Sequence, residues 1–305
     1  MFIVVLGSAA GGGFPQWNCN APTSKGVREG SIRAKPRTQA SIAVSADGVR
    51  WLLVNASPDF RQQQLNTTSL WPSQGLRDTP IKAVLLTSAE IDHVAGLLSM
   101  RESQAFTLWA TARVHDILAE NPIFTALSSH YVERRSFELE AAWDIAGVDG
   151  PLGLSIEPFP VPGKVPLFLE ARHAGNLAGS AGDTIGLRIS QGDKAFFYIP
   201  GCAELTPALR ERLCGAALVF FDGTLWTDDE LVRLGISAKT GHRMGHMSID
   251  GADGTTAAFR DLDVRRKIFI HVNTTNPILD EESASHAAIR SAGWEVAEDG
   301  MEIRL

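Results

Sequence analysis

Short apolar runs recur along this chain, and several are followed directly by ionisable side chains. The runs over 81–86, 218–221 and 267–272 have the length and composition of buried β-strands. The ionisable residues that accompany such runs are, in chain order, Asp92 with His93, Asp222, His246 and His271. In open α/β sheets, ligands bind beyond the carboxyl ends of the strands. The pattern therefore predicts an α/β fold with a functional site at one edge of a sheet.

Composition indicates a globular chain and excludes several protein classes. Of the 305 residues, 44% are hydrophobic and 21% are charged, close to the average of folded domains. No window approaches the length of about 20 apolar residues that a membrane-spanning helix needs. The 28 basic and 35 acidic residues give a net charge of −7, which argues against broad binding of nucleic acid. We expect a single domain over 1–305, with a long proline-rich surface loop over 151–166, that binds neither nucleic acid nor a membrane.

The three cysteines, Cys19, Cys202 and Cys214, do not form the even, spaced set of a disulfide framework. The apolar start of the chain lacks the basic residues of a secretory signal, and it predicts a strand over 2–6. These two features lead us to expect a cytoplasmic protein.

Other local signals predict a hairpin and two helices. An Asp-Gly turn at 47–48 separates apolar runs over 41–44 and 51–55, which is typical of a β-hairpin. Apolar residues recur at helical spacing over 93–103, and a second helix is expected over 281–292 because a glycine follows its end.

The segment around Asp92 and His93 is the most informative one. It follows the apolar run over 81–86 and precedes the predicted helix. Carboxylate and imidazole side chains are good ligands for Zn²⁺ and Fe²⁺. The alternative interpretation is structural, with Asp92 capping the helix and His93 packing beside it.

Three further residues can each be interpreted as functional or as structural. His271 ends a strand, and it either ligates a metal or hydrogen-bonds a neighbour. Asp222 closes another strand, and it either orients a ligand histidine or makes a turn. His246 belongs to a pair of histidines four residues apart that suits a helix face, although flanking glycines favour a mobile loop.

The order of these residues resembles the metallo-β-lactamase superfamily. Its motif His-x-His-x-Asp-His falls on 88–93, where the last two positions match and the first two histidines are replaced by Ser88 and Glu90. The segment 245–248 is similar to the late His-Ser/Thr motif of the tRNA 3′-processing nucleases in this superfamily, and His271 is similar to the final ligand histidine. The resemblance implies an α/β fold of the metallo-β-lactamase type, an αββα sandwich.

Within the superfamily, the chain more closely resembles the proteins of pyrroloquinoline quinone (PQQ) biosynthesis. The segments that carry this likeness are 5–19, 91–93, 182–188 and 221–226. The likeness implies a role in making PQQ through iron-dependent hydroxylation of the tyrosine in a Glu-Tyr-derived intermediate. An alternative view of the same family implies a carrier that transports PQQ or an intermediate.

The departures from the hydrolase motif favour a single metal ion. Hydrolases of this superfamily hold two metals that share a hydroxide, whereas Ser88, Glu90 and Cys202 stand where ligands of that pair are expected. Two histidines and one carboxylate remain, which is the ligand set of a non-haem Fe(II) oxygenase with open positions for O₂ and substrate. We therefore expect Fe(II), with Zn²⁺ as the alternative occupant of purified protein, on three metal ligands: Asp92, His93 and His271.

Three other residues are expected to assist catalysis. Glu90 either ligates the metal directly or accepts a proton near the phenol. His246 is expected at the mouth of the site as a substrate ligand or general acid–base group, and Asp222 is expected to orient His246 or His271. A residual metallohydrolase is the remaining alternative, and it would need Ser88 and Glu90 to support a second metal.

The loop at Cys19 departs from the family in another respect. Relatives often carry three cysteines here as part of a structural zinc site, whereas this chain has alanine and serine at the two later positions. One thiolate cannot complete a four-coordinate site, so we expect no structural zinc and a loop held by packing of Trp17 and Pro22. The basic stretch over 23–36 either covers an acidic substrate or is a solvated surface loop.

The expected partners follow from this interpretation. They are O₂, a small-molecule or peptide-derived PQQ precursor, and other proteins of the PQQ pathway. A homodimer is the default expectation because twofold dimers are the commonest soluble oligomers.

Overall fold

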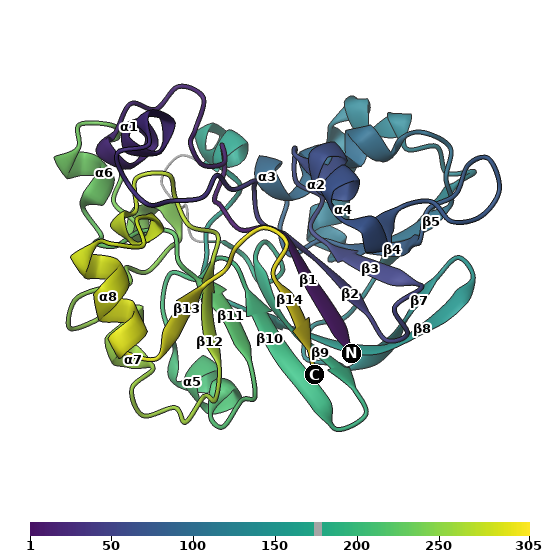
Figure 1. Ribbon diagram of the computed structural model, residues 1–305. Coiled ribbons are helices and arrows are strands. Elements are labelled where there is room, and N and C mark those ends of the chain that lie inside the picture. The colour runs from purple at the N-terminus through teal and green to yellow at the C-terminus, as the bar shows by residue number, and fades with distance from the viewer. Residues whose placement is uncertain (174–178) are drawn as a thin grey trace.

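In the computed structural model, two seven-stranded β-sheets pack face to face (Figure 1). The structure describes residues 1–173 and 179–305. The first sheet consists, in spatial order, of β14 (Glu302–Arg304), β1 (Phe2–Gly7), β2 (Ser41–Ser45), β3 (Trp51–Val54), β4 (Ile81–Leu85), β5 (Phe106–Ala110) and β6 (Val132–Ser136). The second sheet consists, in spatial order, of β13 (Trp294–Val296), β12 (Lys267–Ile270), β11 (Val219–Asp222), β10 (Lys194–Ile199), β9 (Ile185–Gln191), β8 (Gly150–Pro160) and β7 (Trp143–Gly147).

Each sheet combines an antiparallel part with a parallel part. In the first sheet, the strands from β14 to β3 pair antiparallel, and those from β3 to β6 pair parallel. In the second sheet, the strands from β7 to β10 pair antiparallel, and those from β10 to β13 pair parallel. Parallel neighbours share a direction, so the carboxyl ends of each parallel set lie at one edge of the sheet.

Helices cover the outer faces of the two sheets (Figure 1). The α-helices are α1 (Pro22–Glu29), α2 (Phe60–Asn66), α3 (Ile91–Val94), α4 (Ala112–Glu120), α5 (Pro207–Leu213), α6 (Glu230–Arg233), α7 (Thr255–Ala258) and α8 (Ala284–Ser291). The short 3₁₀ helices are η1 (Thr68–Leu70), η2 (Ala95–Met100), η3 (Pro122–Ala126), η4 (Leu167–His173), η5 (His242–Met244) and η6 (Pro277–Leu279). Among the described residues, no helix has both the length and the apolar character needed to cross a membrane.

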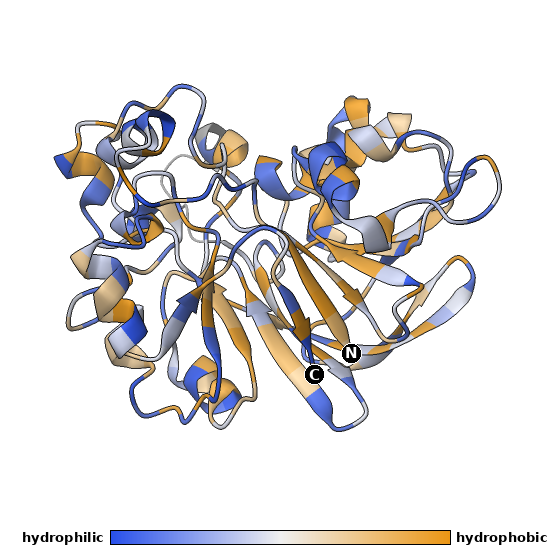
Figure 2. Cartoon of the chain, in the orientation of Figure 1, coloured by the Kyte–Doolittle hydropathy of each residue, from blue (hydrophilic) through white to orange (hydrophobic). Residues whose placement is uncertain are grey.

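The alternation of side chains along the strands explains why the sequence shows unbroken apolar runs. Along β1, Ile3 and Val5 belong to the core between the sheets, whereas Val4 and Leu6 pack under the outer helices of the first sheet. Both faces of the strand are therefore buried. Figure 2 shows the consequence, with apolar colouring concentrated on the strands and mixed colouring on the outer helices. The expected αββα sandwich is confirmed.

The prediction of a surface loop over the proline-rich region is wrong for its first part, because β8 contains Pro151, Pro158 and Pro160. β8 pairs with β7 through its first half and with β9 through its second half. Each of these prolines lies where β8 has only one registered neighbour. A proline is tolerated there because its missing N–H removes no ladder hydrogen bond on the unpaired side.

The predicted hairpin and helices differ from the structure only at their boundaries. The antiparallel pair β2–β3 confirms the hairpin. The helix expected over 281–292 is α8, which begins after Ser283, whose hydroxyl accepts a hydrogen bond from the His286 N–H at 3.0 Å. The helix expected over 93–103 begins earlier, as the single turn α3, and continues as the 3₁₀ helix η2.

The turn after α3 leaves no room for a side chain at Gly96. A Cβ atom there would lie 2.8 Å from the carbonyl oxygen of Ala56 and nearer still to that of Ser57. We expect Gly96→Ala to lower the free energy of unfolding by about 2 kcal/mol or more, because backbone would have to move. Urea unfolding measures this effect, with Ser99→Ala as the control at an exposed position of η2. Equal midpoints for the two variants would contradict the close packing.

Candidate metal centre

The candidate residues gather where strands of the two sheets reach their carboxyl ends. His93 and Asp92 lie on α3, a few residues after β4 ends at Leu85. Asp222 is the last residue of β11, and His271 follows the last residue of β12. The parallel pairing of β11 with β12 therefore brings two of these residues to one edge.

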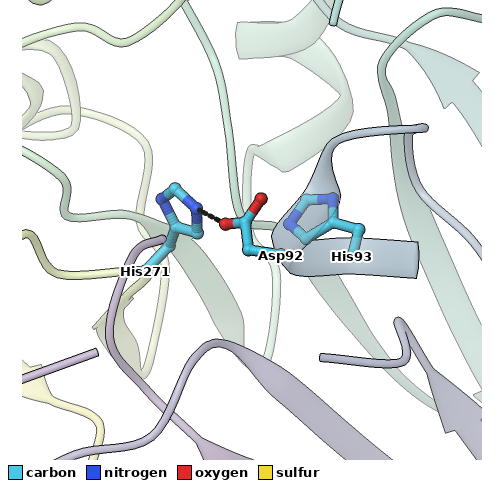
Figure 3. Close-up of side chains that lie close together, drawn as sticks. All are labelled: Asp92, His93 and His271. Atoms are coloured by element: carbon cyan, nitrogen blue, oxygen red, sulfur yellow. Dashed lines mark hydrogen bonds and ion pairs between the residues drawn. The ribbon is translucent and has the colours of Figure 1, made fainter. Parts of the chain in front are cut away.

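Asp92, His93 and His271 converge to form one group. Their potential ligand atoms all lie within 4.8 Å of one another. Figure 3 shows the Asp92 carboxylate between the two imidazole rings. The His271 Nε2 atom donates to Asp92 Oδ2 at 3.0 Å. The two residues are 179 positions apart in the chain, so the group exists only in the folded protein.

His93 presents a free nitrogen to this group. Its Nδ1 atom lies 2.7 Å from Ser88 Oγ and 3.4 Å from Thr87 Oγ1, whereas its buried Nε2 atom has no hydrogen-bond partner among the described residues. A buried polar atom without a partner is costly unless another ligand satisfies it. Burial also lowers the pKa of His93 and so favours the neutral imidazole that metals bind. This nitrogen fits a metal ligand.

The two other members of the group form a charged pair. Burial raises the pKa of Asp92, but the nearby His93 and His271 outweigh burial and lower it. Burial lowers the pKa of His271, but the hydrogen bond and charge of Asp92 outweigh burial and raise it. The Asp92 carboxylate is thus ionised, and it holds a proton on His271.

Metal uptake by this group is expected to release that proton. The ion pair between Asp92 and protonated His271 stabilises the metal-free fold. This contribution is complete below the ordinary histidine pKa of 6.5, and it is lost as the pH rises through the raised pKa of His271. A metal that binds Nε2 must displace the same proton. We expect the apparent affinity for Zn(II) to fall about tenfold for each pH unit below the pKa of His271. Chelator competition across the neutral pH range measures the slope, and a flat profile would contradict this pairing.

Asp222 is fully buried, and both of its oxygens are hydrogen-bonded. Oδ2 accepts from His246 Nδ1 at 2.7 Å and from Cys202 N at 2.9 Å. Oδ1 accepts from Thr224 Oγ1 at 2.6 Å and from Thr224 N at 3.0 Å. Asp222, His246 and His271 also form a group with potential ligand atoms within 4.8 Å. Because its oxygens are already occupied, Asp222 is better suited to orienting histidines than to holding a metal.

Thr224 also belongs to this region, although it was not among the residues expected from the sequence. Its hydroxyl lies 2.9 Å from His271 Nδ1 and 3.1 Å from His246 Nδ1. The signal that could have found it is its position two residues after the strand-ending Asp222, where a hydroxyl can bond back to the carboxylate.

Glu90 lies at the rim of the site but outside both groups. Its carboxylate accepts hydrogen bonds from Lys164 Nζ at 2.8 Å and from Leu167 N at 3.2 Å. Ser88, which occupies a histidine position of the superfamily motif, lies against His93. Both residues that replace the motif histidines, Ser88 and Glu90, therefore have hydrogen-bond partners within the protein.

A cavity of about 400 Å³ opens over the three-residue group. Its lining includes Glu90, Lys164, Lys239, Met244 and His246 together with the metal-centre side chains.

Cys202, which stands near the position of a metal ligand in the superfamily hydrolases, is buried. Its thiol donates to the carbonyl oxygen of Glu204, and burial raises the pKa of the thiol to about 12. The thiol is therefore protonated near neutral pH and is a poor metal ligand.

The expectation that packing of Trp17 and Pro22 holds the loop at Cys19 is wrong, because Trp17 is 86% exposed and Pro22 is exposed as well. Hydrogen bonds hold the loop instead. The Arg28 guanidinium donates to the carbonyl oxygens of Gln16 and Cys19, and Thr274 accepts from Gln16 N at 3.2 Å. Thr274 is 258 residues from Gln16, and a partner so far away is not visible in local sequence.

The basic stretch over 23–36 is largely paired within the protein. Lys25 lies 3.9 Å from Glu29, Arg33 Nε lies 2.9 Å from Glu281, and Lys35 Nζ lies 2.6 Å from Glu298. Arg28 binds backbone carbonyls. These contacts favour the solvated-loop interpretation over a cover for an acidic substrate.

Comparison with known proteins identifies the family. The model of the family described as a beta-lactamase superfamily domain matches residues 50–272. Coenzyme PQQ synthesis protein B of Xanthomonas oryzae pv. oryzae (strain MAFF 311018) is 63% identical over 305 residues, and that of Xanthomonas campestris pv. campestris (strain B100) is 62% identical, with 100% of each chain covered in both cases. The 1.98-angstrom crystal structure of Zn(2+)-bound PqqB from Methylobacterium extorquens has a TM-score of 0.94 at 45% identity and covers 100% of both chains. The chain therefore belongs to the coenzyme PQQ synthesis protein B family of the beta-lactamase superfamily.

Proposed function

We propose that this protein acts in PQQ biosynthesis as a mononuclear non-haem iron oxygenase that hydroxylates the tyrosine ring of a Glu-Tyr-derived intermediate. The observation that carries the proposal is the group of two buried histidines and one partly buried carboxylate, Asp92, His93 and His271, that lines an open cavity. The names of the relatives support the pathway. The residue set supports the chemistry, because two histidines and a carboxylate are the ligands of Fe(II) oxygenases.

The residues of this chain fit a metal ion. The unpartnered Nε2 of His93 and the Nε2 of His271 beside Asp92 are donors of the right kind. The Methylobacterium relative is a Zn(2+)-bound protein, and imidazole ligands accept Zn²⁺ as well as Fe²⁺. When bound, Fe(II) would supply the activation of O₂ that ring hydroxylation requires.

His246 is the residue that we assign to proton transfer with the substrate. It lines the cavity, and its Nδ1 is bound to the buried Asp222, so its other nitrogen remains available to a phenol. Asp222 keeps this ring oriented without touching the substrate. Glu90 holds the rim of the cavity through Lys164 and the Leu167 amide, where it lies within reach of bound substrate.

The decisive experiment loads the purified protein with Fe(II) without oxygen, adds Glu-Tyr dipeptide and a two-electron reductant such as ascorbate, and then admits O₂. The reductant is needed because only one oxygen atom enters the ring and the other is reduced to water. We expect one iron per chain and a product that has gained one oxygen atom on its tyrosine ring, detected by mass spectrometry. The Zn(II)-loaded protein is the matched control, because Zn²⁺ has no redox chemistry. Tight PQQ binding with neither iron binding nor oxygen transfer would favour the carrier instead.

The hydrolase alternative has less support. A second metal would need ligands at the positions of Ser88 and Glu90. The Ser88 hydroxyl lies against His93, and the Glu90 carboxylate is bound by Lys164 and the Leu167 amide. A metal-loaded protein that hydrolyses phosphodiester or lactam substrates would overturn this ranking.

A further inference from the structure

One buried carboxylate serves two histidines. Asp222 contacts His246 directly through Oδ2 at 2.7 Å. Its Oδ1 atom accepts a hydrogen bond from the Thr224 hydroxyl at 2.6 Å, and the oxygen of that hydroxyl lies 2.9 Å from His271 Nδ1. The carboxylate thus reaches His246 directly and His271 through a single hydroxyl group.

The proton count decides the direction of these hydrogen bonds. The Thr224 hydroxyl has one hydrogen, and its shortest contact is with the ionised Asp222, which can only accept. Toward His271 the hydroxyl oxygen therefore acts as an acceptor, so Nδ1 of His271 carries a hydrogen. Nε2 is then the nitrogen that faces Asp92 and the metal position.

The other ligand histidine shows the same arrangement on the opposite side of the centre. His93 Nδ1 lies 2.7 Å from Ser88 Oγ, and its Nε2 has no partner among the described residues. Each ligand ring thus has a hydroxyl at Nδ1 and leaves Nε2 to the site. Of these two hydroxyls, that of Thr224 is itself bonded to a carboxylate, which strengthens it as an acceptor.

The backbone around His271 is also held by Thr224. His271 has a φ of 61°, a left-handed conformation that is costly for a residue other than glycine. The Thr224 carbonyl accepts the N–H of Asn273 at 3.0 Å, just past this strained position. Thr224 therefore contacts the ligand segment through both its side chain and its main chain.

We propose that Thr224 is a positioning residue, which keeps the hydrogen of His271 on Nδ1 and directs Nε2 toward the metal beside Asp92. This inference rests on the proposed metal centre and extends it to a residue that does not touch the metal. Removal of such an outer partner lowers metal affinity by about 10–100-fold in other sites.

The test compares Thr224→Val, which removes the hydroxyl, with Thr224→Ser, which retains it. Zn(II) affinity of each full-length variant is measured by competition with a chromophoric chelator. We expect a loss of about 10–100-fold for Thr224→Val and recovery in Thr224→Ser. Thr107→Val is the matched control, because Thr107 is buried on β5 with a hydroxyl that has no hydrogen-bond partner among the described residues.

Nitrogen-15 NMR of the Zn(II)-loaded parent protein gives a second readout that does not depend on the folding of any variant. We expect a hydrogen on Nδ1 of His271 and none on Nε2. A hydrogen on Nε2 would overturn the proposal. So would parent-like Zn(II) affinity in folded Thr224→Val, or a Thr224→Ser variant no better than Thr224→Val. A parent protein that binds no Zn(II) would instead overturn the metal centre itself and the inference with it, so the two failures are distinguishable.

Discussion

The double variant His93→Ala/His271→Ala is expected to lose metal binding and turnover completely. These two rings supply both nitrogen donors of the proposed centre, and Asp92 would remain as a single carboxylate. We expect the affinity for Fe(II) and Zn(II) to fall by at least about a thousandfold, because a lone carboxylate retains almost none of the binding free energy of the full set. Anaerobic titration with Fe(II) and chelator competition with Zn(II) measure the loss.

A matched control separates this effect from the loss of any two histidines. His115→Ala/His130→Ala also removes two imidazoles, but His115 binds the Arg135 carbonyl and His130 packs edge-on against Tyr131, both outside the proposed centre. We expect this control to bind metal like the parent. Persistence of iron binding and turnover in the His93/His271 variant would mean that the assigned centre is wrong.

Asp222→Ala is expected to destabilise the fold strongly. The substitution leaves the backbone N–H groups of Cys202 and Thr224 without their acceptor, and it removes the shortest contacts of Thr224 Oγ1 and His246 Nδ1. A buried polar group that loses its partner costs about 1–3 kcal/mol. We therefore expect the free energy of unfolding to fall by about 4 kcal/mol or more, measured by urea denaturation of the metal-free protein.

The control for this variant is Asp261→Ala. Asp261 is exposed and pairs only loosely with Arg210, at 3.8 Å. Its loss is expected to change stability by no more than about 1 kcal/mol, as is usual for surface ion pairs. Similar unfolding midpoints for Asp222→Ala and Asp261→Ala would show that the Asp222 network does not hold the fold.

The strands and the edge of the site could be predicted because both follow from local pattern. A strand buried on both faces needs apolar residues at every position, and the runs ending near Leu85, Asp222 and Ile270 are of this kind. The polar residues that follow these runs mark the carboxyl ends of strands, where α/β folds bind ligands. Asp92, His93 and His271 were recognisable as candidates on that basis.

The wrong predictions concern segments whose position depends on tertiary contacts. The proline-rich composition around Pro158 predicts a surface loop, yet Pro158 pairs with Leu187 of β9 at a position of β8 that has no paired strand on its other side. Packing of Trp17 and Pro22 is the prediction for the loop at Cys19, yet the Arg28 guanidinium and Thr274 hold this loop and the Trp17 indole is exposed. No local pattern reports such contacts.

By itself, the sequence determined the class of fold, the buried strands and the residue types available to the site, because these depend on hydrophobic periodicity and side-chain chemistry. Only the tertiary structure decided which of those residues meet. It placed His271 beside Asp92, Ser88 against His93, and Thr224 between Asp222 and His271. The physical reason is that a metal centre is a matter of distances of a few ångströms, and those distances are set by the packing of two sheets rather than by neighbours in the chain.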